Sequence, residues 1–230
     1  MREFAASSAY LGLLISLAVY LLGLKLKQKT GLALFNQLLV AVAGTMLFLL
    51  AFDIDYEAYN RSARLLSDLL TPATVCLAVP LYEQFERLRA HARAVLAGIV
   101  SGVVASLLCV LVLCALFGLD HAAYVTLLPK SITTAIGMGV CEELGGYVAI
   151  TVAVIIMTGI LGNMIAETVF RLLRIEEPIA RGVALGTSAH AIGTAKALEL
   201  GEVEGAMSSL SIAVAGILTV FGASLFAGFL

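Results

Sequence analysis

Three mostly apolar stretches of this sequence carry side chains that could bind a small anion. They span residues 70–80, 128–139 and 186–196, and in each a serine or threonine stands near a proline or glycine. Proline and glycine favour the start or interruption of a helix, and a hydroxyl can cap the helix that follows. A helix start presents free N–H groups and about half a positive charge. Two or three such starts that converge would hold an anion.

The strongest candidate is Lys130, which is followed by three hydroxyl side chains. A lysine supplies a full charge and the hydroxyls supply donors, so a carboxylate is the simplest ligand that fits. The alternative is a lysine that reaches toward the membrane interface beside hydroxyls bonded to their own helix. The three stretches together give the predicted substrate-binding residues Thr71, Thr74, Lys130, Ser131, Thr133, Thr134, Thr187, Ser188, His190 and Thr194.

Histidine and acidic residues extend this list. His190, between two glycines, could bind substrate or carry a proton near pH 7, or could be a purely structural donor. Polar residues at membrane depth are costly and often functional, so five of them are candidates for coupling to H⁺ or Na⁺. The alternative for Asp68 is an ion pair with Arg64, four residues earlier on the same helix face. The alternative for Glu142 and Glu143 is that adjacent acids at the end of an element are often solvated. The five candidates are Glu142, Glu143, Asp68, Glu167 and Asn163.

Motifs for enzymatic or metal chemistry are absent from the sequence. The cysteines at 76, 109, 114 and 141 are scattered, with no CxxC pair or His/Cys cluster to hold a metal. The sequence also lacks a phosphate-binding loop, a GxSxG and an HExxH motif. We therefore expect no enzymatic activity and no cofactor other than a coupling ion.

The composition requires a membrane around these side chains. The 230 residues are 61% hydrophobic and 13% charged, whereas soluble domains have about 25% charged residues. A formal charge of −2 without a basic patch argues against nucleic acid. A helix needs about 20 apolar residues to cross a bilayer, so the chain has room for about seven spanning or half-spanning elements. The sequence thus predicts an all-α, multi-pass membrane protein with a single domain over residues 1–230.

The apolar runs give the approximate positions of these elements. Basic loops favour the cytoplasm, which places the amino terminus outside and the lysines at 25–29 and arginines at 87–93 inside. Gly98 and Gly102 have the GxxxG spacing of a helix-packing face. We expect elements near residues 4–24, 32–52, 65–84, 94–117, 124–146, 147–170, 182–200 and 205–230.

The element at 124–146 has two alternatives. If it crosses the membrane fully, Arg171 and Arg174 fall outside; if it turns back, they fall inside, as the charge rule favours. Aligning Thr71 with Ser131, Thr74 with Thr134 and Glu83 with Glu143 also suggests an inverted repeat between this element and the one at 65–84. Two broken elements in corresponding halves are typical of transporters with an inverted repeat.

From about residue 10 to its end, the chain resembles the LrgB/CidB family of bacterial inner-membrane proteins. The residues that carry the resemblance are the three polar stretches, Thr158–Gly162 and Pro178–Ala206. The resemblance implies one of two functions. The older description is of holin-like or antiholin-like proteins that modulate murein hydrolase activity and autolysis with a small LrgA/CidA-type membrane partner. The other is of carriers of small carboxylates, such as a plastid relative that exchanges glycolate and glycerate and bacterial members linked to pyruvate.

Broken elements, capping hydroxyls and a lysine suit an anion-binding carrier better than a holin-like pore of small amphipathic spans. We therefore expect an inner-membrane transporter of pyruvate-, glycolate- or glycerate-like monocarboxylates that forms a homodimer, with the antiholin-like role as the alternative. Three features depart from the family pattern. Ala135 replaces a common proline, Ala191 replaces the glycine after the histidine, and Ala166-Glu167 replaces a Gly-Pro-like pair.

Overall fold

The computed structural model describes residues 10–31 and 35–230, which form helices and turns without a strand. The chain divides into two units, residues 1–76 and 77–230, which are described in turn. The first unit contains α2 (Leu11–Thr30), α3 (Gln37–Ala51), α4 (Tyr56–Asp68) and α5 (Leu70–Cys76). The second contains α6 (Ala78–Glu83), α7 (Phe85–Phe117), α8 (His121–Leu127), α9 (Thr134–Glu143), α10 (Val148–Leu172), α11 (Pro178–Leu200), α12 (Glu202–Phe226) and the short 3-10 helix η2 (Ala227–Phe229).

The predicted all-α membrane architecture is confirmed. Among the described residues, five helical stretches are long and apolar enough to cross a membrane, and α3 is a shorter apolar helix. The five stretches are Leu11–Thr30, Tyr56–Glu83, Phe85–Phe117, Val148–Leu172 and Glu202–Phe229. The single domain over residues 1–230 and the outward amino terminus stay predictions.

The first unit is held together by small and hydroxyl side chains between α2 and α4. The backbone N–H of Gly12 donates to Ser62 Oγ at 2.8 Å, and Ser16 Oγ lies 2.7 Å from the Tyr59 hydroxyl. The break expected near residues 70–80 is not a capped half-helix start. Leu69 and Leu77, which flank α5, both have right-handed helical dihedrals. Helical conformation therefore continues through the stretch that contains Pro72.

In the second unit, α8 and α9 form a hairpin that turns back to the end at which it begins. The backbone N–H of Tyr147, just after the hairpin, donates to Thr126 Oγ1 in α8 at 2.8 Å. Thr151 Oγ1, one turn into α10, donates to the Thr126 carbonyl at 2.8 Å. At the tip, Ser131 Oγ lies 3.2 Å from Ser106 Oγ, which is well inside α7. The segment is therefore re-entrant, as the charge rule favours.

The helix α11 is a second hairpin, entering from the opposite end. Its backbone is non-helical at Ala189 and His190, and the φ of His190 is 42°. The limbs before and after this break lie against each other, because a methyl group added at Gly193 would overlap the Leu185 carbonyl oxygen. Both ends of α11 return to the carboxyl end of α10: Arg181 stacks on Phe170, and Leu200 packs against the same cluster.

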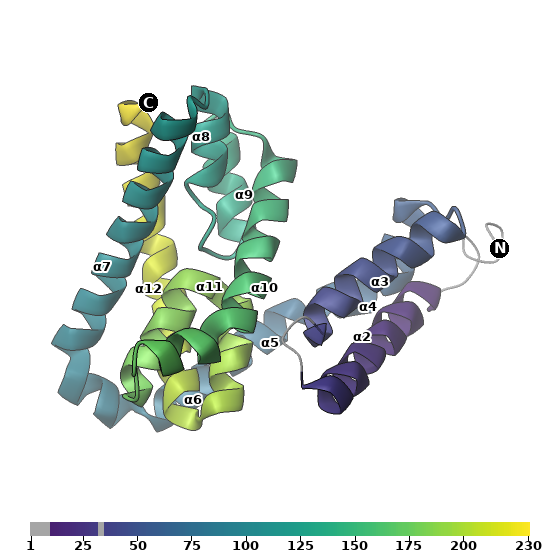
Figure 1. Ribbon diagram of the computed structural model, residues 1–230, viewed down its shortest axis with the longest axis horizontal. Helices are drawn as coiled ribbons and strands as arrows, with labels where there is room; N and C mark the ends of the chain where they lie inside the picture. The colour runs from purple at the N-terminus through teal and green to yellow at the C-terminus, as the bar shows by residue number, and fades with distance from the viewer. Residues whose placement is uncertain (1–9, 32–34) are drawn as a thin grey trace. The chain divides into compact units, whose positions relative to one another are not determined.

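The two hairpins form an inverted repeat, but not the one that the sequence analysis suggested. Span and hairpin alternate: α7 leads into α8–α9, α10 runs the other way and leads into α11, and α12 returns (Figure 1). Corresponding positions carry the same residues, Ala-Ile-Gly at 135–137 and 191–193 and Glu-Leu-Gly at 143–145 and 199–201. The hairpin at 121–143 therefore pairs with α11, not with the element near 65–84.

Arginines gather at one end of the second unit. Arg87, Arg89 and Arg93 lie in the first turns of α7, and Arg171, Arg174 and Arg181 lie where α10 ends and α11 begins. These ends meet, because Gly98 of α7 faces Val183 of α11 and Leu88 and Ile179 pack on one apolar cluster. The charge rule assigns this arginine-rich end to the cytoplasm.

The close approach of the limbs of α11 gives a first prediction. Gly193→Ala should lower stability by about 1–3 kcal/mol, because the added methyl group has no room beside Leu185. Gly139→Ala in α9 is the matched control, since nothing lies near its added methyl group, and it should be neutral or stabilising. Thermal unfolding of the purified protein in detergent measures both. Equal effects would mean that the limbs are not in contact.

The re-entrant hairpin predicts which residues share a membrane face. In a background with Cys76→Ser and Cys109→Ser, Leu119→Cys and Glu142→Cys should react with a membrane-impermeant maleimide from one side, and Glu176→Cys from the other. All three positions are exposed. A fully crossing segment would instead give Leu119→Cys and Glu176→Cys the same side and Glu142→Cys the opposite one.

Candidate functional site

A cavity of about 820 Å³ lies between α7, the first limb of α11 and the tip of the α8–α9 hairpin. Small residues in its walls let the helices approach closely. Gly98 of α7 faces Val183 of α11, and Gly102 faces Thr187. This is the packing face that the GxxxG spacing predicts. The cavity is lined by Ala94, Gly98, Ser101, Gly102, Ala105, Ser106, Cys109, Lys130, Ser131, Ala180, Val183, Ala184, Thr187 and Ser188.

The charged group of this cavity is Lys130, at the tip of the α8–α9 hairpin. Its Nζ donates to Ser131 Oγ at 2.9 Å, and Ser131 Oγ lies 3.2 Å from Ser106 Oγ of α7. Lys130 is half-buried, and within the described residues it forms no ion pair with a carboxylate. A lysine at this depth that has only hydroxyl partners leaves a positive charge uncompensated.

Across the cavity, Thr187 has an unused hydroxyl. The side chain is 6% exposed, and its Oγ1 has no hydrogen-bond partner among the described residues. A buried hydroxyl without a partner costs free energy and is uncommon in folded proteins. Ser188, the next residue, bonds back to the Ala184 carbonyl at 2.6 Å, so its donor is already used. Thr187 therefore places a buried hydroxyl with an unused hydrogen-bonding capacity in this wall.

Together these residues supply the chemical groups that a small anion requires, in a largely apolar cavity. An ammonium group and hydroxyls are the donors that a carboxylate requires, and the small side chains around them leave space for a short carbon skeleton. The site lies at the middle of α7, where the tips of the two opposed hairpins come together.

The sequence comparisons identify the family. Residues 16–229 match the LrgB-like family. The chain belongs to this family. Similar curated proteins include the antiholin-like protein LrgB of Bacillus cereus (strain B4264) and that of Bacillus anthracis (strain A0248). Each is 36% identical over 222 residues, which cover 96% of both chains. No solved structure matches the chain.

Of the substrate-binding residues predicted for this LrgB-like protein, four line the cavity: Lys130, Ser131, Thr187 and Ser188. Thr133 and Thr134 stand at the start of α9 outside it, and Thr133 makes no side-chain cap. Thr194 bonds to Ser208 Oγ at 2.7 Å. The cavity is therefore lined by residues of the α8–α9 tip and of the first limb of α11. The residues that begin α9, Thr133 and Thr134, are not part of it.

His190 joins α11 to α10 within the second half of the repeat. It is 3% exposed, and its Nε2 lies 2.9 Å from the Ile155 carbonyl oxygen of α10. A carbonyl can only accept, so Nε2 carries the hydrogen. The side chain of Ile155 in turn faces Gly137 at the start of α9. His190 thus matches the structural alternative and fixes the tip of α11 to a neighbouring span.

The remaining predicted site residues are not among those that line the cavity. Thr71 is exposed in α5 of the first unit, and the side chain of Thr74 is outside the described residues. Asp68 lies 3.9 Å from Arg64 in an exposed pair of the same helix, as its structural alternative predicts. Glu142 and Glu143 are exposed at the end of α9.

Glu167 and Asn163 both anchor the second limb of α11 to α10. Glu167 forms an ion pair with Lys196, which is 7% exposed and also pairs with Glu199 at 3.2 Å. Asn163 Nδ2 donates to the Ile192 carbonyl at 3.2 Å. The charge that departs from the LrgB-family pattern, Glu167, therefore has a structural partner. Ala135 and Ala191, the other departures, occupy equivalent positions of the two hairpins.

Sequence reasoning missed three polar contributors to this part of the protein. Ser106 and Cys109 continue the GxxxG face of α7 and line the cavity, so the spacing of small residues was the available signal. Lys196 stands three residues before Glu199, a helical pairing distance that could have marked it as compensated. Among the described residues, no group of three or more metal-binding side chains comes together.

Two threonines of α11 provide a matched test of the unpaired hydroxyl. Thr187→Val keeps the shape and removes a hydroxyl without a partner, so stability should stay unchanged or rise. Thr194→Val breaks a buried hydrogen bond to Ser208 and should cost about 1 kcal/mol or more. Detergent thermal unfolding compares them. If Thr187→Val destabilised the protein as much as Thr194→Val, its hydroxyl would have a structural partner.

Proposed function

We propose that this protein has the antiholin-like role stated in the name of its relatives, and that it performs this role by carrying a small monocarboxylate across the membrane. The name of relatives that are 36% identical over 96% of the chain supports the first part. The observation that carries the second part is one cavity lined by Lys130, Ser131 and Thr187, with no described carboxylate paired to the lysine.

The electrostatics of the cavity support an anionic substrate. Lys130 has a serine hydroxyl as its partner, and no described carboxylate neutralises it. A charge held away from water is stable only when it is paired, so a substrate carboxylate would complete the site. A cavity of about 820 Å³ exceeds the volume of a three-carbon acid, so water would enter with pyruvate, glycolate or glycerate.

The opposed hairpins support a carrier that exposes its site to one face at a time. One hairpin enters beside the carboxyl end of α7 and the other beside the carboxyl end of α10, and their tips come together at the cavity. Movement of one repeat against the other would alternate access, as in other transporters built from inverted repeats.

The second candidate function is direct modulation of murein hydrolases, without transport. The relatives' name supports an antiholin-like role and says nothing of transport, so it favours this candidate. A small LrgA/CidA-like membrane partner would then be expected. For either function we propose an inner-membrane location and a homodimer. The five candidate spans support the membrane location but do not identify which membrane.

Uptake into liposomes tests the carrier. Labelled pyruvate, glycolate or glycerate should enter saturably and compete with one another, whereas glycerol should neither enter nor compete. Lys130→Met should lower uptake at least about tenfold, because a charge-assisted contact contributes about 1.5–3 kcal/mol. Thr187→Val should lower it less.

The exposed Lys29→Met, in the first unit, is the control for loss of a lysine and should transport normally. Cys109 offers a direct measure of occupancy. In a Cys76→Ser background, substrate should slow its alkylation because Cys109 lines the cavity. Carrier function would be abandoned if none of the three acids saturated, or if glycerol entered as fast as they did.

Autolysis of cells that lack the native protein separates the two candidates. If transport underlies the antiholin-like role, Lys130→Met should fail to restore normal autolysis at normal expression, while Lys29→Met should restore it. Restoration by a Lys130→Met variant that no longer transports would instead support direct modulation.

A further inference from the structure

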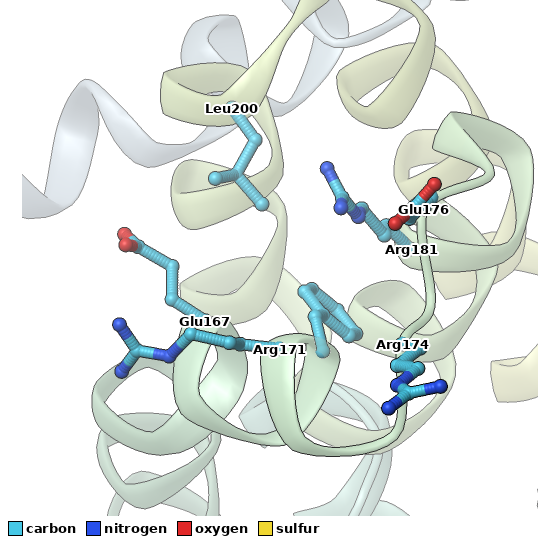
Figure 2. A pocket seen from close by; sticks show the side chains of 7 residues that line it. Glu167, Arg171, Arg174, Glu176, Arg181 and Leu200 are labelled. Carbon is cyan, nitrogen blue, oxygen red and sulfur yellow. The ribbon is translucent and has the colours of Figure 1, made fainter.

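A second pocket, of about 400 Å³, lies at the arginine-rich end of the second unit. It is formed where α10 ends, where α11 begins and where α11 returns. Figure 2 shows Arg171 and Arg174 leaving the end of α10, Arg181 across from them, and Leu200 on the returning limb. The pocket is distinct from the proposed substrate cavity and shares no residue with it.

The arginines of this pocket are largely available to a ligand. Arg171 and Arg174 form no ion pair within the described residues, although Glu167 and Glu176 also line the pocket. Glu167 is engaged by Lys196. Arg181 is held in place, because its Nε donates to the Ile175 carbonyl at 2.7 Å and its guanidinium lies 5.8 Å from the centre of the Phe170 ring.

The backbone at Arg174 has a conformation that is unusual for a residue with a side chain. Its φ is 53°, in the left-handed region that glycine adopts readily and other residues rarely do. The turn closes α10, with the Ile175 N–H donating to the Phe170 carbonyl at 2.8 Å. Helices commonly end in such a turn with glycine at this position. Here the residue is an arginine that lines the pocket.

The position of the pocket matches the headgroup layer of a membrane. With 25 residues, α10 is about 37 Å long, so it exceeds a hydrocarbon core of about 30 Å and its end reaches the interface. Leu172 and Leu173, between the two unpaired arginines, are 74% and 68% exposed. Exposed leucines at a helix end can contact lipid acyl chains, and the arginines beside them can bind a lipid phosphate.

We propose that this pocket binds a phosphate group, presented by an anionic phospholipid of the cytoplasmic leaflet. Guanidinium groups bind phosphate oxygens in a bidentate manner, and three arginines line this pocket, from the end of α10, the turn after it and the start of α11. The bound phosphate would link the fixed span α10 to both ends of the α11 hairpin, whose first limb carries Thr187. The inference does not depend on transport.

Thermal unfolding of the full-length protein in detergent tests the site. Short-chain phosphatidylglycerol should raise the unfolding midpoint by about 5 °C near saturation, and phosphatidylcholine of the same chain length should not. Arg171→Gln with Arg174→Gln should weaken the phosphatidylglycerol effect at least tenfold. The matched control, Arg87→Gln with Arg89→Gln, removes two exposed arginines at the same end and should keep the effect.

Arg174→Gly separates binding from folding. Glycine relieves the left-handed backbone, so this variant should unfold at the same or a higher temperature without lipid, yet lose most of the response to phosphatidylglycerol. An effect of phosphatidylglycerol that survives in Arg174→Gly and in the Arg171→Gln/Arg174→Gln variant would overturn the site.

Inorganic phosphate distinguishes the source of the ligand. If millimolar phosphate gives the same stabilisation and competes with phosphatidylglycerol, the natural ligand is a free phosphate compound; if it does neither, the ligand is the lipid. Stabilisation by phosphatidylcholine equal to that by phosphatidylglycerol would overturn the proposal for both ligands, the lipid and the free phosphate compound. These measurements use no transport assay, so their failure would leave the carrier proposal unaffected.

Discussion

The need to satisfy backbone polar groups inside a membrane shapes the second unit. A chain that turns back halfway leaves peptide groups unpaired, and each would cost several kcal/mol in contact with lipid. Both tips are therefore packed against protein: His190 bonds to the Ile155 carbonyl, and Ser131 lies beside Ser106. Spans α7 and α10 thus cover the breaks, and the cavity lies where this packing is least complete.

The sequence was sufficient to predict the fold class and the family, and its charge asymmetry favoured the re-entrant alternative for residues 124–146 over the crossing one. These depend on hydropathy, charge asymmetry and motif resemblance, each of which is local in sequence. The pairing of the repeat was predicted wrongly, because hydroxyls in similar spacing at 71–74 and 131–134 outweighed the longer agreement between 135–145 and 191–201. Glycine positions that permit close approach, such as 137 and 193, were the more reliable signal.

The site was predicted in part, for a physical reason. Residue type and depth identified Lys130, Ser131, Thr187 and Ser188, but could not show which hydroxyls bond their own helix. Thr194 and His190 have partners within the fold, whereas Thr187 has none among the described residues. That difference depends on contacts between elements far apart in the sequence, which spacing within one helix does not report.

Two lysines of the re-entrant hairpins show how charge compensation separates a structural role from a functional one. Lys196 and Lys130 each lie in a re-entrant hairpin, but Lys196 has two carboxylates and Lys130 has a serine. The first charge is compensated within the protein, so its ion pairs stabilise the hairpin. The second becomes neutral only when an anion binds, so moving the empty site across the membrane carries a bare charge and moving the loaded site does not. On the proposed function, this asymmetry favours exchange of one carboxylate for another over return of the empty carrier.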